Sequence, residues 1–313
     1  MGTKKHLEAA LFIAIAALLA SGAALFFLKD RFAQVYHELK LTYLSRSLWR
    51  PTKKDYKEVS CPEDPVVIGY FGQSNSANFV FPRYDREIPG NLYQFDWRTG
   101  RCYEYKEPLL GADGLGGTTI THFATKLALK TSAPVLISPF GQGGSSAFDW
   151  SDGFLASRHE AALEMMERKN LKPVVFFWHQ GEMGAGTPTN LRLGNQMDIT
   201  PEQKSTETYE IFLKRIIDKT RKSYPDTYFG IALASLCKGK PYEPIRTAQR
   251  SVASANSKNF ISADSDVIAG SGLRYDGCHI SQVGAMKLST EYYNSFIKEI
   301  NKNPKLSKTI FRG

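Results

Sequence analysis

Three side chains in this sequence could together activate a nucleophile: Ser74, Asp276 and His279. A serine hydroxyl attacks a carbonyl carbon only when a neighbouring base removes its proton, and a histidine can be that base. A carboxylate three residues before the histidine could hold the imidazole in the required tautomer. Several chain orders assemble such a triad, so the order alone proves little. The competing interpretation of Ser74 is a cap on the helix that follows it.

The elements that must position these residues are buried strands that end abruptly. Three apolar runs stop at polar or glycine-rich turns, and they span Val66–Gly72, Ala133–Phe140 and Pro173–Trp178. Ser74 follows the first run, and a turn from His179 to Glu182 follows the third. Because the carboxyl ends of parallel strands meet at one edge of a sheet, we expect these turns to converge there.

Strand and helix patterns alternate at least four times along the chain. Helices are expected near residues 118–130, 154–169, 201–224, 244–256 and 280–300, and further strands near 228–236 and 259–263. This alternation predicts an α/β fold, a three-layer α/β/α domain with a mostly parallel sheet and helices on both faces. No internal repeat is seen, and one domain over residues 61–313 is expected.

The composition is that of an ordinary globular protein. The chain has 313 residues, of which 42% are hydrophobic and 23% charged, with a formal net charge of +9. A basic surface can attract anionic partners. The basic residues are scattered, however, and neither zinc-finger spacing nor an RNA-binding aromatic motif is present, so nucleic acid is not expected as a partner.

The amino terminus predicts membrane attachment. Ala9–Leu28 is a run of twenty residues without a charge, preceded by Lys4 and Lys5 and closed by Lys29-Asp30-Arg31. At 1.5 Å per residue such a helix can cross a bilayer core of about 30 Å. We expect residues 1–31 to be a transmembrane anchor, with a cleaved signal peptide as the alternative, and residues 32–60 to be a juxtamembrane helix or linker. Either interpretation places the domain outside the cytoplasm.

Four cysteines lie in the part expected to be exported: Cys61, Cys102, Cys237 and Cys278. They lack the CxxC spacing of metal sites, and no metal is expected. An oxidising compartment allows two disulfides in three possible pairings. We expect Cys61 to pair with Cys102 and Cys237 with Cys278, and the second bond would pin the segment that carries His279.

Four ordered blocks of the sequence resemble the SGNH hydrolase superfamily, and more narrowly the sialate O-acetylesterase and carbohydrate esterase family 6 group. The blocks are Gly72-Gln73-Ser74-Asn75, then Gly143-Gly144-Ser145-Ser146 with Trp150, then Trp178-His179-Gln180-Gly181-Glu182, and finally Asp276 with His279. The resemblance covers about Pro65 to Phe296 and implies a flavodoxin-like sheet.

The resemblance also implies roles for these residues. Ser74 would attack an acetyl ester, His279 would act first as general base and then as general acid, and Asp276 would orient the imidazole. The backbone N–H groups of Ser74 and Gly144 would stabilise the oxyanion. Many superfamily members add an asparagine side chain to the oxyanion hole, and Gln180 would take that place here.

Three further residues have open assignments. Glu182 could orient His279 in place of Asp276, or could make a structural hydrogen bond within its turn. Trp150 is assigned to substrate binding, since an aromatic face suits a sugar ring, although a place in the core is equally consistent with the pattern. Gln73 is also assigned to substrate binding.

Three functions follow from this pattern. The first is a membrane-anchored carbohydrate O-acetylesterase that acts on a cell-envelope or extracellular glycan through an acetyl-serine intermediate, without a cofactor. The second is a glycan O-acetyltransferase that uses the same triad. The third is a catalytically silent glycan-binding membrane protein, which would have no reason to keep the three triad residues together.

Overall fold

The computed structural model describes residues 55–184 and 201–311, with the side chains of residues 201–204 excepted. The anchor expected over residues 1–31 and residues 32–54 of the expected juxtamembrane segment lie outside these ranges. Within them, no helix combines the length and the hydrophobicity needed to cross a bilayer.

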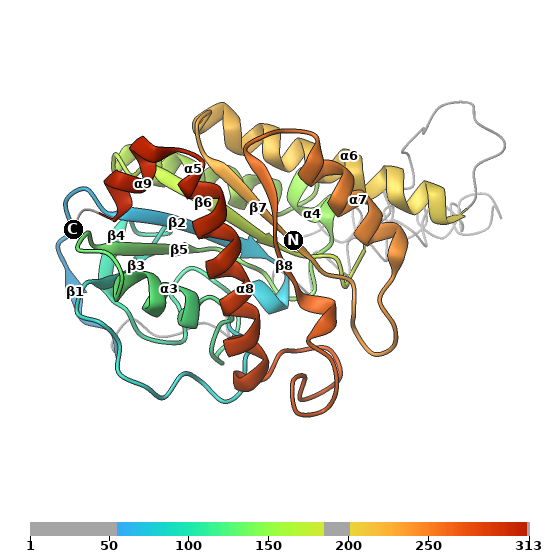
Figure 1. Cartoon of the computed structure of the whole chain (residues 1–313), viewed down its shortest axis with the longest axis horizontal. Helices are drawn as coiled ribbons and strands as arrows, with labels where there is room; N and C mark the ends of the chain where they lie inside the picture. The colour runs from blue at the N-terminus through green and yellow to red at the C-terminus, as the bar shows by residue number, and fades with distance from the viewer. Residues whose placement is uncertain (1–54, 185–200, 312–313) are drawn as a thin grey trace, which may run out of the picture. The chain divides into compact units, whose positions relative to one another are not determined.

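In the described part of the chain, eight strands form one sheet in the order β1-β4-β3-β5-β2-β6-β7-β8 (Figure 1). The strands are β1 (Glu58–Val59), β2 (Val66–Gly72), β3 (Leu92–Asp96), β4 (Arg101–Glu104), β5 (Val135–Pro139), β6 (Pro173–His179), β7 (Tyr228–Leu233) and β8 (Asn259–Asp264). From β3 to β8 every neighbouring pair is parallel, whereas β4 pairs antiparallel with both β3 and β1. The prediction of a mostly parallel sheet is confirmed. Since β1 belongs to the sheet, the domain begins slightly before the expected boundary at residue 61.

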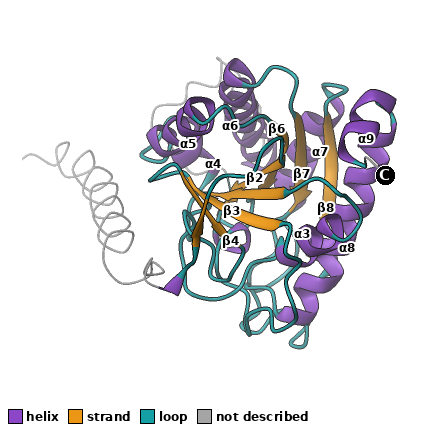
Figure 2. Ribbon diagram, turned by 90° about the vertical axis from the view of Figure 1, so that its left-hand side faces the viewer, coloured by secondary structure: helices purple, strands orange, loops and turns teal. Residues whose placement is uncertain are grey.

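Helices cover both faces of this sheet. They are α3 (Thr121–Ala128), α4 (Ala147–Ser151), α5 (Ala156–Arg168), α6 (Pro201–Ser223), α7 (Glu243–Ser254), α8 (Gln282–Asn301) and α9 (Pro304–Ile310), with short 3₁₀ turns η2 (Ser74–Ser76) and η3 (Ser265–Val267). Apolar residues of α3, α8 and α9 form one core with the sheet, and those of α4 to α7 form the other. Figure 2 shows the strands between α5 and α6 on one side and α8 and α9 on the other, which confirms three layers.

The position of β2 inside the sheet, with a core on each face, explains why its sequence is continuously apolar. Ile68 and Tyr70 face the core under α3 and α8, whereas Val67 and Phe71 face the core under α4 to α7. Successive side chains of a strand point to opposite faces, so a strand covered on both sides has no polar positions. All seven residues of β2 are buried.

Both expected disulfides are present. Cys61 is bonded to Cys102 on β4, and Cys237, shortly after β7, is bonded to Cys278. The second bond therefore ties the segment that carries His279 to the carboxyl end of β7, the strand next to the edge strand β8.

Candidate active site

The nucleophile turn begins where β2 ends. Gly72 has a φ of 134°, and a Cβ atom at this position would lie 2.1 Å from the carbonyl oxygen of His179, so only glycine fits. The N–H of Gln73 donates to the same carbonyl at 3.0 Å. These contacts join the turn to the end of β6 and place Ser74 at the edge of the sheet, where it is 5% exposed.

The hydroxyl of Ser74 is uncommitted. In the hydrogen bonds among described residues, no bond uses it, and the residue at the cap position of η2 is Gln73. The interpretation of Ser74 as a helix cap is therefore wrong. A hydroxyl held at a strand end without a partner remains available to a base.

His279 and Asp276 are paired as expected. Nδ1 of His279 lies 2.6 Å from Oδ2 of Asp276, and Oδ1 of Asp276 accepts the backbone N–H groups of Cys278 and His279 at 2.9 and 2.7 Å. Partial burial acts to raise the pKa of Asp276, but the hydrogen bonds from His279 and from the two N–H groups outweigh it and lower this pKa. A carboxylate bonded to Nδ1 leaves Nε2 of the imidazole to exchange protons.

The residue after Ser74 brings the two ends of the triad together. Nδ2 of Asn75 donates to the carbonyl of Cys278 at 3.2 Å, and Oδ1 of Asn75 accepts the N–H of Ile280 at 3.1 Å. Cys278 and Ile280 are the two chain neighbours of His279. One buried side chain therefore joins the nucleophile turn to the histidine segment across 203 residues of sequence.

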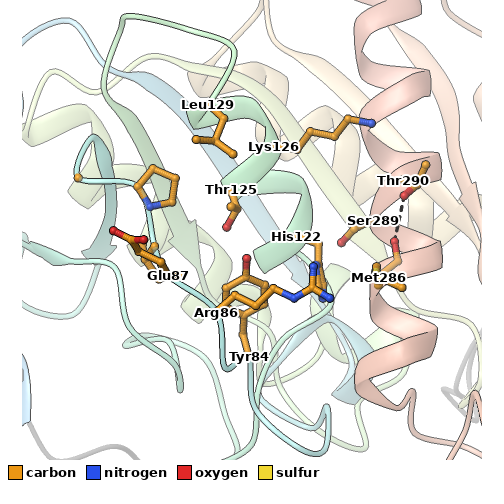
Figure 3. Close-up of a pocket in the computed structure, with 13 residues that line it drawn as sticks. Tyr84, Arg86, Glu87, His122, Thr125, Lys126, Leu129, Met286, Ser289 and Thr290 are labelled. Atoms are coloured by element: carbon orange, nitrogen blue, oxygen red, sulfur yellow. Dashed lines mark hydrogen bonds between the residues drawn. The ribbon is translucent and has the colours of Figure 1, made fainter.

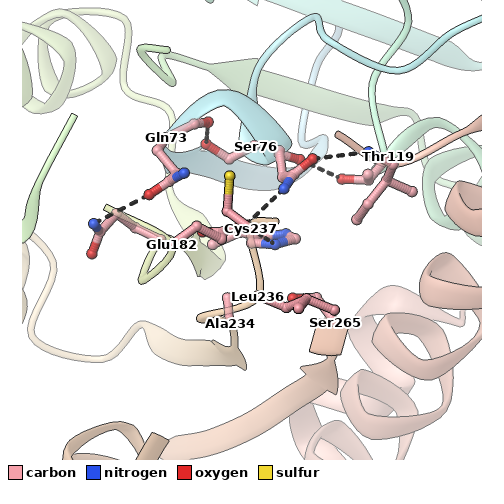
Figure 4. Close-up of polar contacts among 12 residues, drawn as sticks. Gln73, Ser76, Thr119, Glu182, Ala234, Leu236, Cys237 and Ser265 are labelled. Atoms are coloured by element: carbon pink, nitrogen blue, oxygen red, sulfur yellow. Dashed lines mark hydrogen bonds and ion pairs between the residues drawn. The ribbon is translucent and has the colours of Figure 1, made fainter. Parts of the chain in front are cut away.

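Glu182 lies beside this junction and not beside His279. Its Oε1 accepts Nδ2 of Asn75 at 2.7 Å and lies 3.5 Å from Nε2 of His179. Burial acts to raise the pKa of Glu182, but the contacts with His179 and Asn75 hold it at about 2, so the carboxylate is ionised. Figure 4 shows Glu182 next to the nucleophile turn, where Gln73 and Ser76 are labelled. The structure thus pairs His279 with Asp276, and Glu182 supports Asn75.

Two backbone N–H groups are free for an oxyanion. Among the hydrogen bonds of described residues, none uses the N–H of Ser74 or of Gly144 as donor. The glycine loop is held against the nucleophile strand, because the N–H of Gln142 donates to the carbonyl of Gly72 at 3.0 Å. Gly144 has a φ of 68°, a left-handed conformation that glycine adopts without strain. The loop can therefore present this N–H beside Ser74.

Gln180 is placed differently from the expectation. Its buried Nε2 donates to the carbonyls of Ser145 and Gly184 at 3.2 and 3.0 Å and to Oε1 of Gln73 at 3.3 Å. An amide nitrogen has two protons, and three acceptors already share them. Gln180 therefore braces the turns around the site, and its assignment as third oxyanion donor is corrected.

The two residues assigned to substrate binding are structural. Trp150 is fully buried among Phe71 and Trp178, and its indole N–H donates to Oγ of Ser145 at 2.8 Å. Gln73 is 2% exposed, and its Oε1 accepts the N–H of Met183 at 3.0 Å. Of the two alternatives for Trp150, the structure shows the one in the core. The contacts of Gln73 are with protein groups, since its Oε1 also accepts Nε2 of Gln180.

The aromatic side chains that do reach the surface were missed. The ring of Tyr275 lies nearly parallel to the imidazole of His279, with centroids 5.8 Å apart, and Phe79 is similarly placed at 5.3 Å. Phe81 meets Tyr275 edge to face at 6.3 Å. Phe81 is 65% exposed and Tyr275 45% exposed. Their signal in the sequence is their position directly beside the Ser74 and Asp276 blocks.

No metal centre is formed by the described residues, in the sense that no three His, Cys, Asp or Glu side chains gather as ligands. The arrangement instead offers a free hydroxyl, a carboxylate-paired imidazole and two free N–H groups at one edge of the sheet. These are the parts of a nucleophilic acyl-transfer site.

Similarity to known proteins is found among solved structures. No family model matches the chain, and a search of curated proteins finds no significant match. A crystal structure of an Arabidopsis thaliana protein is similar with a TM-score of 0.57 and 18% identity over 75% of this chain and 98% of that one. The chain is also similar to a putative GDSL-like lipase from Parabacteroides merdae (TM-score 0.48, 15% identity, 76% and 98% covered). A further similar structure is a carbohydrate acetylesterase from Xanthomonas citri (0.47, 16%, 75% and 57%). At these identities the likeness is one of fold.

Proposed function

We propose that this protein is a serine esterase that removes acetyl groups from the hydroxyls of a cell-envelope or extracellular glycan. The observation that carries the proposal is the double hydrogen bond of Asn75 to both neighbours of His279, which joins the histidine to the turn of Ser74. The choice of an acetylated carbohydrate follows the resemblance of the four sequence blocks.

The reaction would proceed in two balanced steps. Oγ of Ser74 attacks the acetyl carbon while Nε2 of His279 takes the hydroxyl proton, and the N–H groups of Ser74 and Gly144 donate to the oxyanion. The bond to the sugar oxygen then breaks as His279 returns the proton to that oxygen. Water attacks the acetyl-serine, again with His279 as base, and acetate leaves with Ser74 restored.

The exposed aromatic side chains support a bulky leaving alcohol. Because His279 protonates the leaving oxygen, the alcohol must lie beside the imidazole. Tyr275 and Phe81 are the exposed aromatic rings at that position. An aromatic face can pack against the apolar face of a sugar ring, so this side of the site suits a carbohydrate.

The proposal includes an extracytoplasmic location with a tether formed by residues 1–31. The extracytoplasmic location is supported by the two disulfides of the described domain, since such bonds persist in oxidising compartments. Cell fractionation with protease protection of the domain would test it, and a domain accessible only from the cytoplasm would contradict it.

The test is a hydrolysis screen of acetylated sugars with the full chain. We expect acetate release by the wild type and a loss of about a thousandfold or more in Ser74→Ala and His279→Ala. A serine-reactive phosphonate should label the wild type but not Ser74→Ala. Ser254→Ala, a change of an exposed serine on α7, is the matched control and should keep full activity.

Two results would count against the proposal. Full activity of Ser74→Ala would remove the proposed nucleophile. Transfer of the acetyl group to an added sugar acceptor, without acetate release, would identify a transferase that uses the same residues.

A further inference from the structure

A cavity of about 670 Å³ lies apart from the triad, between α3, α8 and the loop of residues 84–90 (Figure 3). None of Ser74, Asp276 and His279 lines it. Its volume is within the range of small-molecule sites in proteins. A cavity of this size, lined by none of the triad residues, is a candidate for a second binding site.

Two residues of α3 that line this cavity, His122 and Thr125, each carry a buried polar atom without a partner. Thr125 is 9% exposed, and in the described part of the chain neither its Oγ1 nor Nε2 of His122 has a hydrogen-bond partner. Side chains three residues apart lie on one face of a helix, and both residues line the cavity. Because buried polar groups are nearly always bonded in native proteins, this pair points to a polar ligand.

His122 presents its imidazole in the neutral form. Burial lowers the pKa of His122, the charge of Arg86 lowers it further, and Asp85 acts in the opposite direction. A neutral imidazole has one donor and one acceptor nitrogen, and Thr125 adds a hydroxyl. Together they offer the hydrogen-bonding groups that suit the hydroxyls of a sugar.

The remaining wall is apolar with a cationic rim. Leu129 is 70% exposed and Met286 39% exposed, and Tyr84 adds an aromatic ring. Arg86 and Lys126 also line the cavity. The ammonium of Lys126 lies over the ring of Tyr293, 4.2 Å from its centroid, at the side of α8 (Figure 3). Glu87 is the one acidic residue among the lining residues, so cations outnumber carboxylates two to one. The ligand favoured by this lining has an apolar face, hydroxyl groups and a negative charge.

One loop and the start of α8 connect the residues of the cavity to those at the rim of the active site. The loop that supplies Tyr84 begins at Phe81, whose carbonyl accepts the N–H of Gln282 at the start of α8. Met286 follows the cap residue Ser281 of the same helix by five residues, a rise of roughly 8 Å. A chain of several sugars could therefore reach from one site to the other.

We propose that this cavity is an accessory site that binds an acidic sugar unit of the glycan while Ser74 acts on an acetyl group elsewhere on the same chain. The cavity stands on its own geometry, whereas the choice of a carbohydrate among anionic ligands rests on the proposed function.

Calorimetric titration of the full chain with trigalacturonic acid tests the site directly, because this probe has no acetyl group and is not turned over. We expect measurable binding, a dissociation constant about tenfold higher in Thr125→Val and in the double variant Arg86→Gln/Lys126→Gln, and no change in Lys130→Gln. Lys130 is exposed and does not line the cavity. With acetylated polygalacturonate, the two cavity variants should raise KM about tenfold, while hydrolysis of ethyl acetate stays unchanged.

Undetectable binding at millimolar probe, or equal binding by all variants, would overturn the proposal. Binding of inorganic phosphate or neutral trigalactose as tightly as the acidic sugar would also overturn it. The two proposals fail separately: Ser74-dependent hydrolysis without probe binding removes only the accessory site. Probe binding without hydrolysis removes only the esterase.

Discussion

The side-chain amide of Asn75 donates to the Glu182 carboxylate at 2.7 Å and, from the same nitrogen, to the carbonyl of Cys278 at 3.2 Å. The backbone carbonyl of Asn75 is also held, since it accepts the hydroxyls of Tyr70 and Thr119 at 3.1 and 2.9 Å. Since Oδ1 of Asn75 also accepts the N–H of Ile280, both polar atoms of its side chain are hydrogen-bonded at the same time. Asn75 is thereby a rigid link between the nucleophile turn and the histidine segment.

We predict that Asn75→Ala lowers kcat of the proposed esterase about a hundredfold, because small misplacements of catalytic groups cost this much. KM should change little, since Asn75 is buried and does not reach the substrate. The rate of Ser74 labelling by a phosphonate should fall in parallel. Steady-state kinetics and labelling kinetics at one temperature measure both effects.

The matched control is Asn91→Ala. Asn91 also donates to backbone carbonyls, those of Ala128 and Thr131, but it lies before β3. This variant should lose stability and keep kcat. Equal losses of kcat in both variants would mean that the effect of Asn75 is general destabilisation.

Replacement of the two candidate carboxylates separates their roles. Asp276→Asn should lower kcat about a thousandfold or more, because an amide at this position favours the wrong tautomer of His279. Glu182→Gln should act only through Asn75, and we expect a loss of about tenfold or less. Measured kcat values for the two variants decide between them, and the opposite order would assign the orienting role to Glu182.

The low pKa of Glu182 predicts a pH dependence of stability. Its pKa is about 2 in the folded protein and about 4.3 in an unfolded chain. A depressed pKa contributes stability that is present above the unfolded value and is lost as the pH falls through the folded value. The contribution is about 3 kcal/mol and should disappear between about pH 5 and pH 2. Urea unfolding over this range should show a smaller change in Glu182→Gln than in the wild type.

The alternation of apolar runs with helical patterns predicted the three layers, because a strand that is buried on both faces has a continuously apolar sequence. The strand β2 has no polar residue from Val66 to Phe71, and the turns after β2, β5 and β6 carry the polar and glycine residues. The same logic placed Ser74 at a strand end. The roles of Asp276 and His279 came from the resemblance of the sequence blocks, and their spacing of three residues is consistent with the hydrogen bond that the structure shows.

What the sequence could not supply is the direction in which a side chain points. Trp150 and Gln180 lie in blocks of polar and aromatic residues, yet both turn inward, one into the core and one toward three carbonyl and amide oxygens. The role of Asn75 depends on contacts across 203 residues of sequence, and no local pattern encodes such contacts. Tyr275 and Phe81 lie near the Asp276 and Ser74 blocks in the sequence, but only the structure shows that their rings are exposed.

We predict that Tyr275→Ala and Phe81→Ala raise KM for an acetylated sugar about three- to tenfold, because a lost aromatic contact costs about 0.5 to 1.5 kcal/mol. Ethyl acetate, whose leaving alcohol is too small to cover these rings, should be hydrolysed at the wild-type rate. Tyr275→Phe keeps the ring and should retain the KM of the wild type. An equal loss on both substrates would show that Tyr275 acts on the position of His279 instead.

The two disulfides allow a matched comparison of stability and catalysis. Each bond links cysteines 41 residues apart in the sequence, so the loss of either one should cost a similar amount of chain entropy, about 4 kcal/mol in the simplest account. The double variants Cys61→Ala/Cys102→Ala and Cys237→Ala/Cys278→Ala should therefore show similar losses of stability in denaturant unfolding.

The effects of the two double variants on catalysis should differ, because only Cys278 is directly adjacent to His279 in the chain. A further bond, from the N–H of Lys238 to the carbonyl of Gly277 at 2.9 Å, accompanies the Cys237–Cys278 disulfide and also depends on the position of this segment. Without the disulfide the histidine segment keeps its bonds to Asn75 but loses its covalent tie to the end of β7. We expect kcat to fall about tenfold or more in Cys237→Ala/Cys278→Ala and to stay near the wild-type value in Cys61→Ala/Cys102→Ala. Equal kcat values in the two variants, measured well below their unfolding temperatures, would show that the contacts of Asn75 alone suffice to position His279.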